Sequence, residues 1–137
     1  MDKIRIFALG GPDVAGKPHY VVEINYDLFV IEAGIKYPDT EQLGIEMIIP
    51  DMKYLVENKD RVKAVFITHA HDDAMAALPY LLRQANVPIY TTPLSAVMIE
   101  EMLKKQNIKE VKIHRIKRNG KLAINGVNIR TFGLTHS

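Results

Sequence analysis

The stretch FITHAHDDAMAALPY, residues 66–80, constrains the fold more than any other part of the chain. The β-branched run Val62–Thr68 leads into it and predicts a buried strand. Two histidines and two aspartates then crowd into the next five residues. A helix capped by one of these aspartates would run to about Gln84, with Pro79 near a kink or irregular turn. A buried strand that passes directly into a helix indicates an α/β fold.

Strands and helices continue to alternate along the rest of the chain. Thr92 as N-cap and Pro93 at the first helical position predict a helix that runs through Gln106. Asn125-Gly126 predicts a tight hairpin between two short strands. Further strands are expected at residues 4–8, 20–24, 28–33, 87–90, 111–116, 122–124 and 127–132, and a helical turn at 52–56.

The composition is that of a single globular domain. The chain has 137 residues, of which 47% are hydrophobic and 25% charged, with a net charge of +2. The absence of cysteine excludes disulfides, thiolate-zinc sites and a cysteine nucleophile, so any metal must be held by imidazole and carboxylate groups. The apolar run at the N-terminus is too short for a signal peptide, and no apolar run in the chain is long enough to span a membrane. We therefore expect a cytoplasmic protein without membrane contact.

The histidines and aspartates at 69–73 have the spacing of metal ligands. His69 and His71 are two residues apart, so in an extended segment they point to the same side and can chelate one divalent metal. Asp73 can supply a carboxylate to a neighbouring metal, and a two-metal site suits hydrolysis. His136 follows Thr135 as His69 follows Thr68, so it could bring a third imidazole.

Simpler interpretations of these residues stay open. A pair of histidines two apart is common, and the aspartates could act only as helix caps. His19 follows a glycine-rich loop and could lie near the site, but a position on a surface loop is the preferred expectation. His114 lies in the basic segment 112–121, which could contact RNA phosphate or could be a solvated edge strand protected by lysines.

At these residues the sequence resembles the metallo-β-lactamase superfamily, whose signature is HxHxDH. More closely, it is similar to the ribonuclease J family of the β-CASP branch over essentially the whole chain. The stretches that carry the resemblance are ALGG at 8–11, Gly16-Lys17, FVIEAGIKYP, EQLGIEMIIPDMKYLVENKDRVKAVFITHAH, ALPYLL, NVPIY and the closing THS. The resemblance implies an α/β fold, the αββα sandwich, with residues 1–137 forming the N-terminal half of the lactamase domain. The β-CASP and C-terminal domains would then be absent from this chain.

The resemblance also implies an activity, metal ligands and partners. The activity would be hydrolysis of RNA phosphodiesters, 5′–3′ exonucleolytic, endonucleolytic or both, in mRNA decay and rRNA maturation. His69, His71 and His136 would hold one metal, while Asp73 would help to hold a second and serve as the catalytic carboxylate. The metal would be Zn²⁺, with Mn²⁺ or Mg²⁺ as alternatives. The partners would be RNA and either a ribonuclease J paralogue or a second copy of the chain.

Several positions depart from the family pattern. Ala74 stands where the signature HxHxDH has its last histidine, and Glu32 stands where the second-strand motif usually has an aspartate. Asp13 and Val14 stand where the first loop usually has a glycine and a glutamate. This pattern resembles a second, degenerate-site paralogue and implies a weakly active enzyme with a doubtful second metal. The fragment alone is expected to be inactive and to expose apolar surface, which could lead to self-association. Two alternatives are a non-catalytic RNA-binding scaffold and a small-molecule hydrolase, the latter disfavoured by the long LGI…IPD lead-in.

Overall fold

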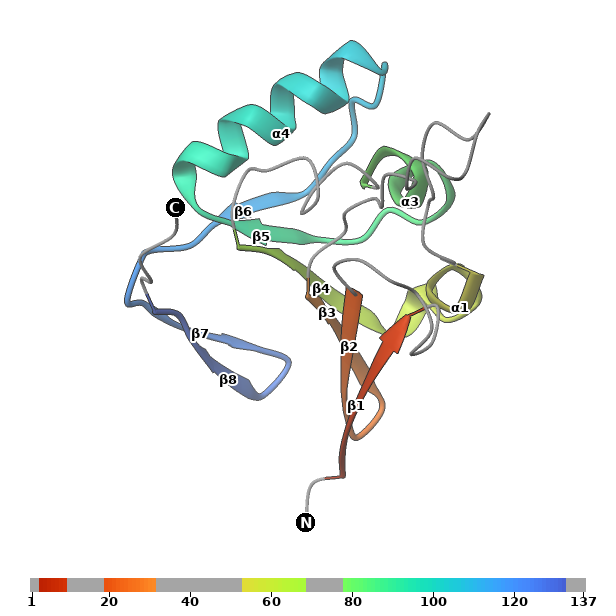
Figure 1. Cartoon of the computed structure of the whole chain (residues 1–137), viewed down its shortest axis with the longest axis vertical. Coiled ribbons are helices and arrows are strands. Elements are labelled where there is room, and N and C mark those ends of the chain that lie inside the picture. The colour runs from red at the N-terminus through yellow and green to blue at the C-terminus, as the bar shows by residue number, and fades with distance from the viewer. Residues whose placement is uncertain (1–2, 10–18, 32–52, 69–77, 133–137) are drawn as a thin grey trace, which may run out of the picture.

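The computed structural model describes residues 3–9, 19–31, 53–68 and 78–132. These residues form one six-stranded sheet, helices and a separate two-stranded hairpin (Figure 1). The elements in chain order are β1 (Ile4–Leu9), β2 (His19–Ile24), β3 (Asp27–Ile31), α1 (Lys53–Glu57), the 3₁₀ turn η1 (Lys59–Arg61), β4 (Val62–Ile67), α3 (Leu78–Gln84), β5 (Ile89–Thr91), α4 (Pro93–Lys105), β6 (Ile113–Arg115), β7 (Lys121–Ile124) and β8 (Val127–Arg130).

The sheet has the order β1-β2-β3-β4-β5-β6, so every strand pairs with its neighbour in the sequence. β1, β2 and β3 pair antiparallel, whereas β3, β4, β5 and β6 pair parallel. Each parallel step needs a crossover connection, and α4 provides the one between β5 and β6. The expected α/β class is therefore confirmed.

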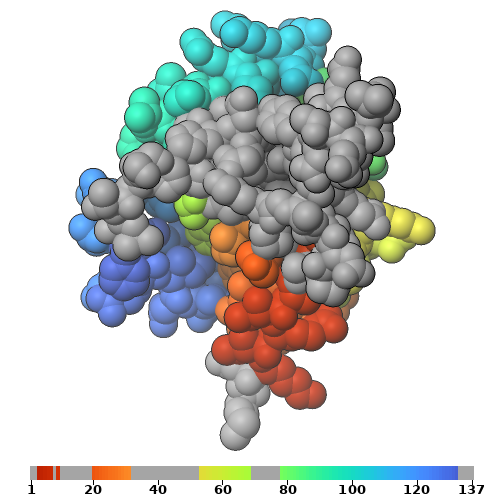
Figure 2. Space-filling model, in the orientation of Figure 1, coloured from red at the N-terminus to blue at the C-terminus, as the bar shows by residue number. Residues whose placement is uncertain are grey.

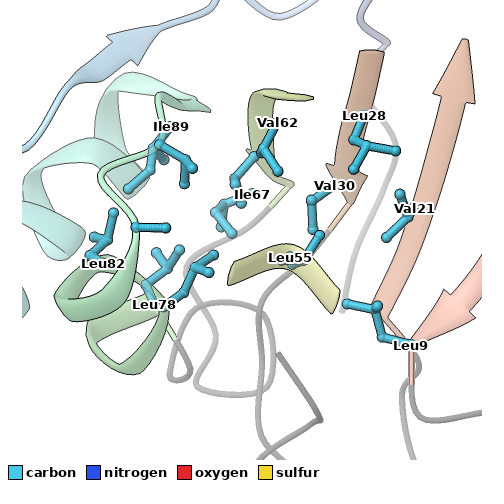
Figure 3. Close-up of a cluster of buried hydrophobic side chains, with 14 of the residues drawn as sticks. Leu9, Val21, Leu28, Val30, Leu55, Val62, Ile67, Leu78, Leu82 and Ile89 are labelled. Carbon is cyan, nitrogen blue, oxygen red and sulfur yellow. The ribbon is translucent and has the colours of Figure 1, made fainter. Parts of the chain in front are cut away.

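The helices bury their apolar side chains against one face of the sheet. Leu55 of α1, Leu78 of α3 and Ile99 of α4 are each 0% exposed and belong to one cluster with side chains of β2, β3, β4 and β5. Figure 3 shows part of this cluster, with side chains of β3 and β4 pointing toward α1 and α3. Burial of these side chains is the main stabilising contribution to this half of the molecule.

The β7–β8 hairpin packs on the opposite face of the sheet. Phe29, Ala64 and Phe66 form a second buried cluster there, against which Ile124, Val127 and Ile129 of the hairpin pack. At the hairpin tip, Asn125 and Gly126 have φ angles of 49° and 83°, as the predicted Asn-Gly turn requires. Asn125 Nδ2 donates to Asp27 Oδ2 at 2.6 Å, which fixes the tip against the start of β3.

This second face is only partly covered within the described residues. Ile4 and Ile6 of β1 are 64% and 65% exposed, and Tyr20 of β2 is also exposed. The expectation of exposed apolar surface is therefore confirmed at these strands, whereas self-association stays a prediction.

Most predicted elements are present, with shifted ends. The Thr92 side chain accepts from the Ser95 amide, Pro93 opens α4, and the helix ends one residue before Gln106. Pro79 lies in the first turn of α3, where its missing N–H costs little. β5 was predicted at 87–90 but begins after Pro88, which has no N–H for the ladder.

Three other boundaries differ from the prediction. β6 has only three residues because it pairs with β5, which also has only three. β8 ends at Arg130 because that residue pairs with Lys121, the first residue of β7. His19, expected on a surface loop, is instead the first residue of β2.

Candidate functional site at the carboxyl ends of the parallel strands

The carboxyl ends of the parallel strands lie together at one edge of the sheet. Ile31 of β3 is in register with Phe66 of β4, which is in register with Tyr90 of β5. The last described residues at this edge are Ile31, which ends β3, and Thr68, which follows β4. Glu32 follows the first of these residues in the sequence, and the run His69-Ala-His-Asp-Asp follows the second. In parallel α/β sheets this edge is where ligands and catalytic groups collect.

The predicted ligands themselves lie outside the described residues. This applies to His69, His71, Asp73 and His136 and equally to Ala74, Glu32, Asp13 and Val14, which carry the departures from the family pattern. Within the described ranges no three histidine, aspartate or glutamate side chains gather as metal ligands. The arrangement of the predicted metal centre is therefore still a prediction, and the structure supplies the strand edge that precedes it.

A buried hydrogen bond fixes the end of β4 just before this run. Thr91 is 0% exposed, and its hydroxyl donates to the carbonyl oxygen of Ile67 at 2.9 Å. Buried backbone oxygens without a partner are costly, so this bond holds the last residue of β4 against β5. The sequence did not single out Thr91, because a threonine in a short strand is common and only the pairing brings it opposite Ile67.

We expect Thr91→Val to lower the free energy of unfolding by about 1–3 kcal/mol, because the carbonyl of Ile67 loses its donor. Thr91→Ser keeps the hydroxyl and is expected to lose less. Urea denaturation of the two variants beside the parent protein measures the difference. A valine variant that loses no more free energy of unfolding than the serine variant would show that the hydrogen bond does not set the cost.

A row of aromatic side chains crosses β4, β5 and β6 on the face of the sheet that carries the hairpin. The rings of Phe66 and Tyr90 lie 5.5 Å apart, and those of Tyr90 and His114 are stacked at 4.6 Å. His114 is exposed, so the prediction that it is a solvated residue is confirmed, and its ring also covers Tyr90. Contact of this histidine with RNA is not tested by the structure.

A charged cluster occupies the opposite, amino-terminal end of the parallel strands. The Arg61 guanidinium forms an ion pair with Glu23, donates to the carbonyl of Tyr26 at 2.9 Å and lies over its ring. Arg5 pairs with the same glutamate at 3.2 Å. The hydrogen bond from Arg61, aided by the charge of Arg5, holds the pKa of the Glu23 carboxyl below its ordinary value. This cluster joins β2 to the turn before β4 and is structural.

The lowered pKa of Glu23 sets the sign of a pH dependence. Below the ordinary carboxyl pKa of 4.5 the unfolded chain binds the proton more readily than the folded chain. Stability from this group is therefore present above that pH and is lost as the pH falls through the lowered folded value. We expect Glu23→Gln to flatten the acid decline of the free energy of unfolding.

Urea denaturation at a series of pH values, from neutral pH down through the acid range below the ordinary carboxyl pKa of 4.5, measures this effect. Glu57→Gln is the control, since that carboxylate is exposed and lies 3.8 Å from Lys53 in α1. A Glu23→Gln variant that loses the same free energy at every pH would contradict the assignment.

The comparisons with known structures define the fold class. The chain is similar to a metallo-β-lactamase superfamily protein of Sulfolobus tokodaii, with a TM-score of 0.55 and 16% identity over 91% of this chain and 53% of that one. A diphosphatase of the PhnP family gives a TM-score of 0.57 with 16% identity over 95% and 57% of the two chains. A flavo di-iron protein of Thermotoga maritima gives a TM-score of 0.54 with 13% identity over 82% and 26%. At these identities the likeness shows the metallo-β-lactamase fold.

The family follows from the sequence comparisons. Residues 37–137 match the family model described as the beta-lactamase superfamily domain. The chain therefore belongs to the β-lactamase superfamily. It is also similar to the proteins called Ribonuclease J 2 of Staphylococcus aureus and Staphylococcus saprophyticus, with 39% and 37% identity over 135 residues, or 98% of this chain. The chain spans about a quarter of the length of these relatives, 24% in each case.

Two further features bear on the remaining expectations. No helix in the described ranges is both long and apolar enough to cross a membrane. The absence of cysteine from the sequence leaves no disulfide.

Proposed function

We propose that this protein is a metal-dependent ribonuclease of the ribonuclease J type. The observation that carries the proposal is the 37–39% identity to proteins called Ribonuclease J 2 over nearly the whole chain. The strand edge that precedes the histidine–aspartate run supports it, because hydrolases of this fold class need their ligands at strand ends. Exonucleolytic or endonucleolytic cleavage, roles in mRNA decay and rRNA maturation, and a cytoplasmic location belong to the same proposal.

The donor set of the sequence fits a divalent metal. His69, His71 and His136 offer three imidazoles and Asp73 a carboxylate, which are ligands of Zn²⁺ and also suit Mn²⁺. When bound, such a metal would act as a Lewis acid that lowers the pKa of a water molecule and stabilises charge on a phosphate oxygen. Asp73 would act as a carboxylate ligand of a second metal and as the acceptor of a proton.

The replacement at position 74 points to weak activity. Ala74 has no atom that can bind a metal, so a second ion would be held by fewer ligands than HxHxDH provides. A non-catalytic, RNA-binding subunit that pairs with an active paralogue or with a second copy is the alternative. The departures at Ala74, Glu32 and Val14 favour that alternative, since they fall in the sequence motifs that supply the family's site, while the described residues form a buried apolar core.

Cleavage of a 5′-monophosphorylated RNA by the purified full-length protein in the presence of Mn²⁺ tests the proposal. The variant His69→Ala/His71→Ala is expected to lose cleavage. His114→Ala is the matched control, because it also removes an imidazole but from an exposed stack on Tyr90, and it is expected to keep cleaving. If the parent protein cleaves no faster than the double variant, the scaffold alternative replaces the enzyme.

A further inference from the structure

The base of the β7–β8 hairpin gathers positive charge, and no carboxylate among the described residues forms an ion pair with it. Four cations and no acidic residue occur between positions 117 and 132. Taking these four from the 18 basic residues of the chain leaves 14, against 16 acidic residues. The whole excess of positive charge thus comes from this segment. We define the cationic turn as five exposed residues, namely Lys117, Arg118, Lys121, Arg130 and Phe132.

Hydrogen bonds hold this turn in one shape. The Gly120 amide donates to the Lys117 carbonyl at 3.2 Å, which closes a tight turn. The Thr131 hydroxyl accepts from the Gly120 amide at 2.8 Å and donates to the Lys117 carbonyl at 2.6 Å. The Thr131 amide also donates to the Gly120 carbonyl at 2.9 Å. Cations from the turn and from both strands are therefore presented by a fixed backbone.

The pairing of the hairpin brings two like charges face to face. Lys121 is directly opposite Arg130 in the register, and both side chains are exposed. Like charges at directly opposed positions destabilise a hairpin. Within the described part of the chain, none of the four cations forms an ion pair, in contrast with Arg115, which pairs with Glu100 at 3.3 Å. A bound anion would relieve this repulsion, so the arrangement suits an anionic ligand.

An aromatic ring lies beside these charges. Phe132 is 70% exposed, and the Arg130 guanidinium lies 5.7 Å from its ring centroid. Grooves that bind single-stranded nucleic acid combine cations, which contact the phosphates, with exposed rings, on which bases stack. Lysines that only guard a sheet edge against aggregation need no such ring. In Figure 2 the blue atoms of β7 and β8 lie on the surface at the left of the molecule.

We propose that the cationic turn binds the phosphate backbone of single-stranded RNA, with one base stacked on Phe132. This surface is formed by residues other than the predicted metal ligands, and it would hold a stretch of the strand independently of cleavage. The inference rests on the proposed function, because it takes RNA as the polyanion that this protein meets. It adds a second contact region on the lactamase half of the molecule.

The test measures binding of a fluorescent single-stranded RNA without metal, in EDTA, so that no cleavage contributes. The key variant of the full chain is Lys121→Gln/Arg130→Gln. It removes the like-charge pair, so its stability is expected to equal or exceed that of the parent, and lost binding cannot reflect unfolding. We expect affinity at 50 mM salt to fall by about tenfold or more. The slope of log affinity against log salt should fall by about 1.4, or 0.7 for each phosphate contact.

The matched control is Lys105→Gln/Lys109→Gln, which removes the same charge at the end of α4 and just after it. Both residues are exposed, and the end of α4 lies far from the hairpin in Figure 1. This control is expected to keep at least half of the affinity and the full salt slope. Phe132→Leu is expected to weaken binding several-fold without changing the salt slope.

Two results would overturn the inference. One is equal binding by the hairpin variant and the control. The other is a parent protein that does not bind RNA at low salt. A protein that binds RNA through the cationic turn but does not cleave it with Mn²⁺ would keep this inference while removing the enzymatic proposal. Conversely, if the parent protein cleaves RNA and the hairpin variant binds RNA as tightly as the parent, the enzymatic proposal is kept and this inference is removed.

Discussion

Replacing Ala74 with histidine is expected to raise RNA cleavage by at least about 100-fold and to raise the metal content from about one to about two ions per chain. The change completes HxHxDH and restores an imidazole to the second metal. Removing a residue that only supports a metal ligand typically costs about 10–100-fold in metal affinity or activity. Adding a metal ligand itself should therefore have a larger effect. Elemental analysis of the purified protein and cleavage of a 5′-monophosphorylated RNA measure the two quantities.

The control for this prediction is Ala74→Asn, which adds a polar side chain of moderate size but no imidazole. It is expected to leave the metal content near one ion and cleavage near the parent level. A histidine variant that behaves like the asparagine variant would show that position 74 does not face a metal. That result would also remove the main reason to regard the parent site as degenerate.

Ile67→Ala is expected to lower the free energy of unfolding by about 2–5 kcal/mol. Ile67 ends β4, is 1% exposed and belongs to the cluster beneath α1 and α3. Truncation removes contacts with a rigid sheet on one side and helices on the other, so little relaxation is available to fill the space. Urea denaturation measures the loss, and the same variant is expected to impair metal binding, because the first predicted ligand, His69, follows Ile67 by two residues.

Leu94→Ala is the matched control for the core substitution. Leu94 is 73% exposed on α4, so its truncation is expected to change the free energy of unfolding by no more than about 0.5 kcal/mol. A loss below about 1 kcal/mol for Ile67→Ala would contradict the packing described for the end of β4.

The fold could be predicted where local chemistry decides the structure. The β-branched run before Thr68, the Thr92-Pro93 helix start and the Asn125-Gly126 turn each have a strong local preference, and the structure has a strand, a helix and a hairpin there. Strand ends were predicted less well, because they depend on the partner. β6 is short only because β5 is short, and no pattern within residues 111–116 records that.

The candidate site stays a prediction, and the sequence offered it as a set of residues without a geometry. The spacing of His69, His71 and Asp73 is compatible with metal ligands, whereas the strand edge that precedes them depends on the pairing of β3, β4 and β5. The hydrogen bond from Thr91 to Ile67 could not be predicted either, because it joins two strands that are 24 residues apart. The opposed charges of Lys121 and Arg130 become visible only once the hairpin register is known.

The consecutive order of the six strands has a consequence for synthesis on the ribosome. Each new strand, from β2 to β6, pairs with the strand that was made immediately before it, so no strand has to wait for a partner encoded much later. Contacts between segments close in sequence form faster than distant ones, and domains begin to fold while the chain is still being elongated. The sheet can therefore grow in the order of translation, with β6 added last.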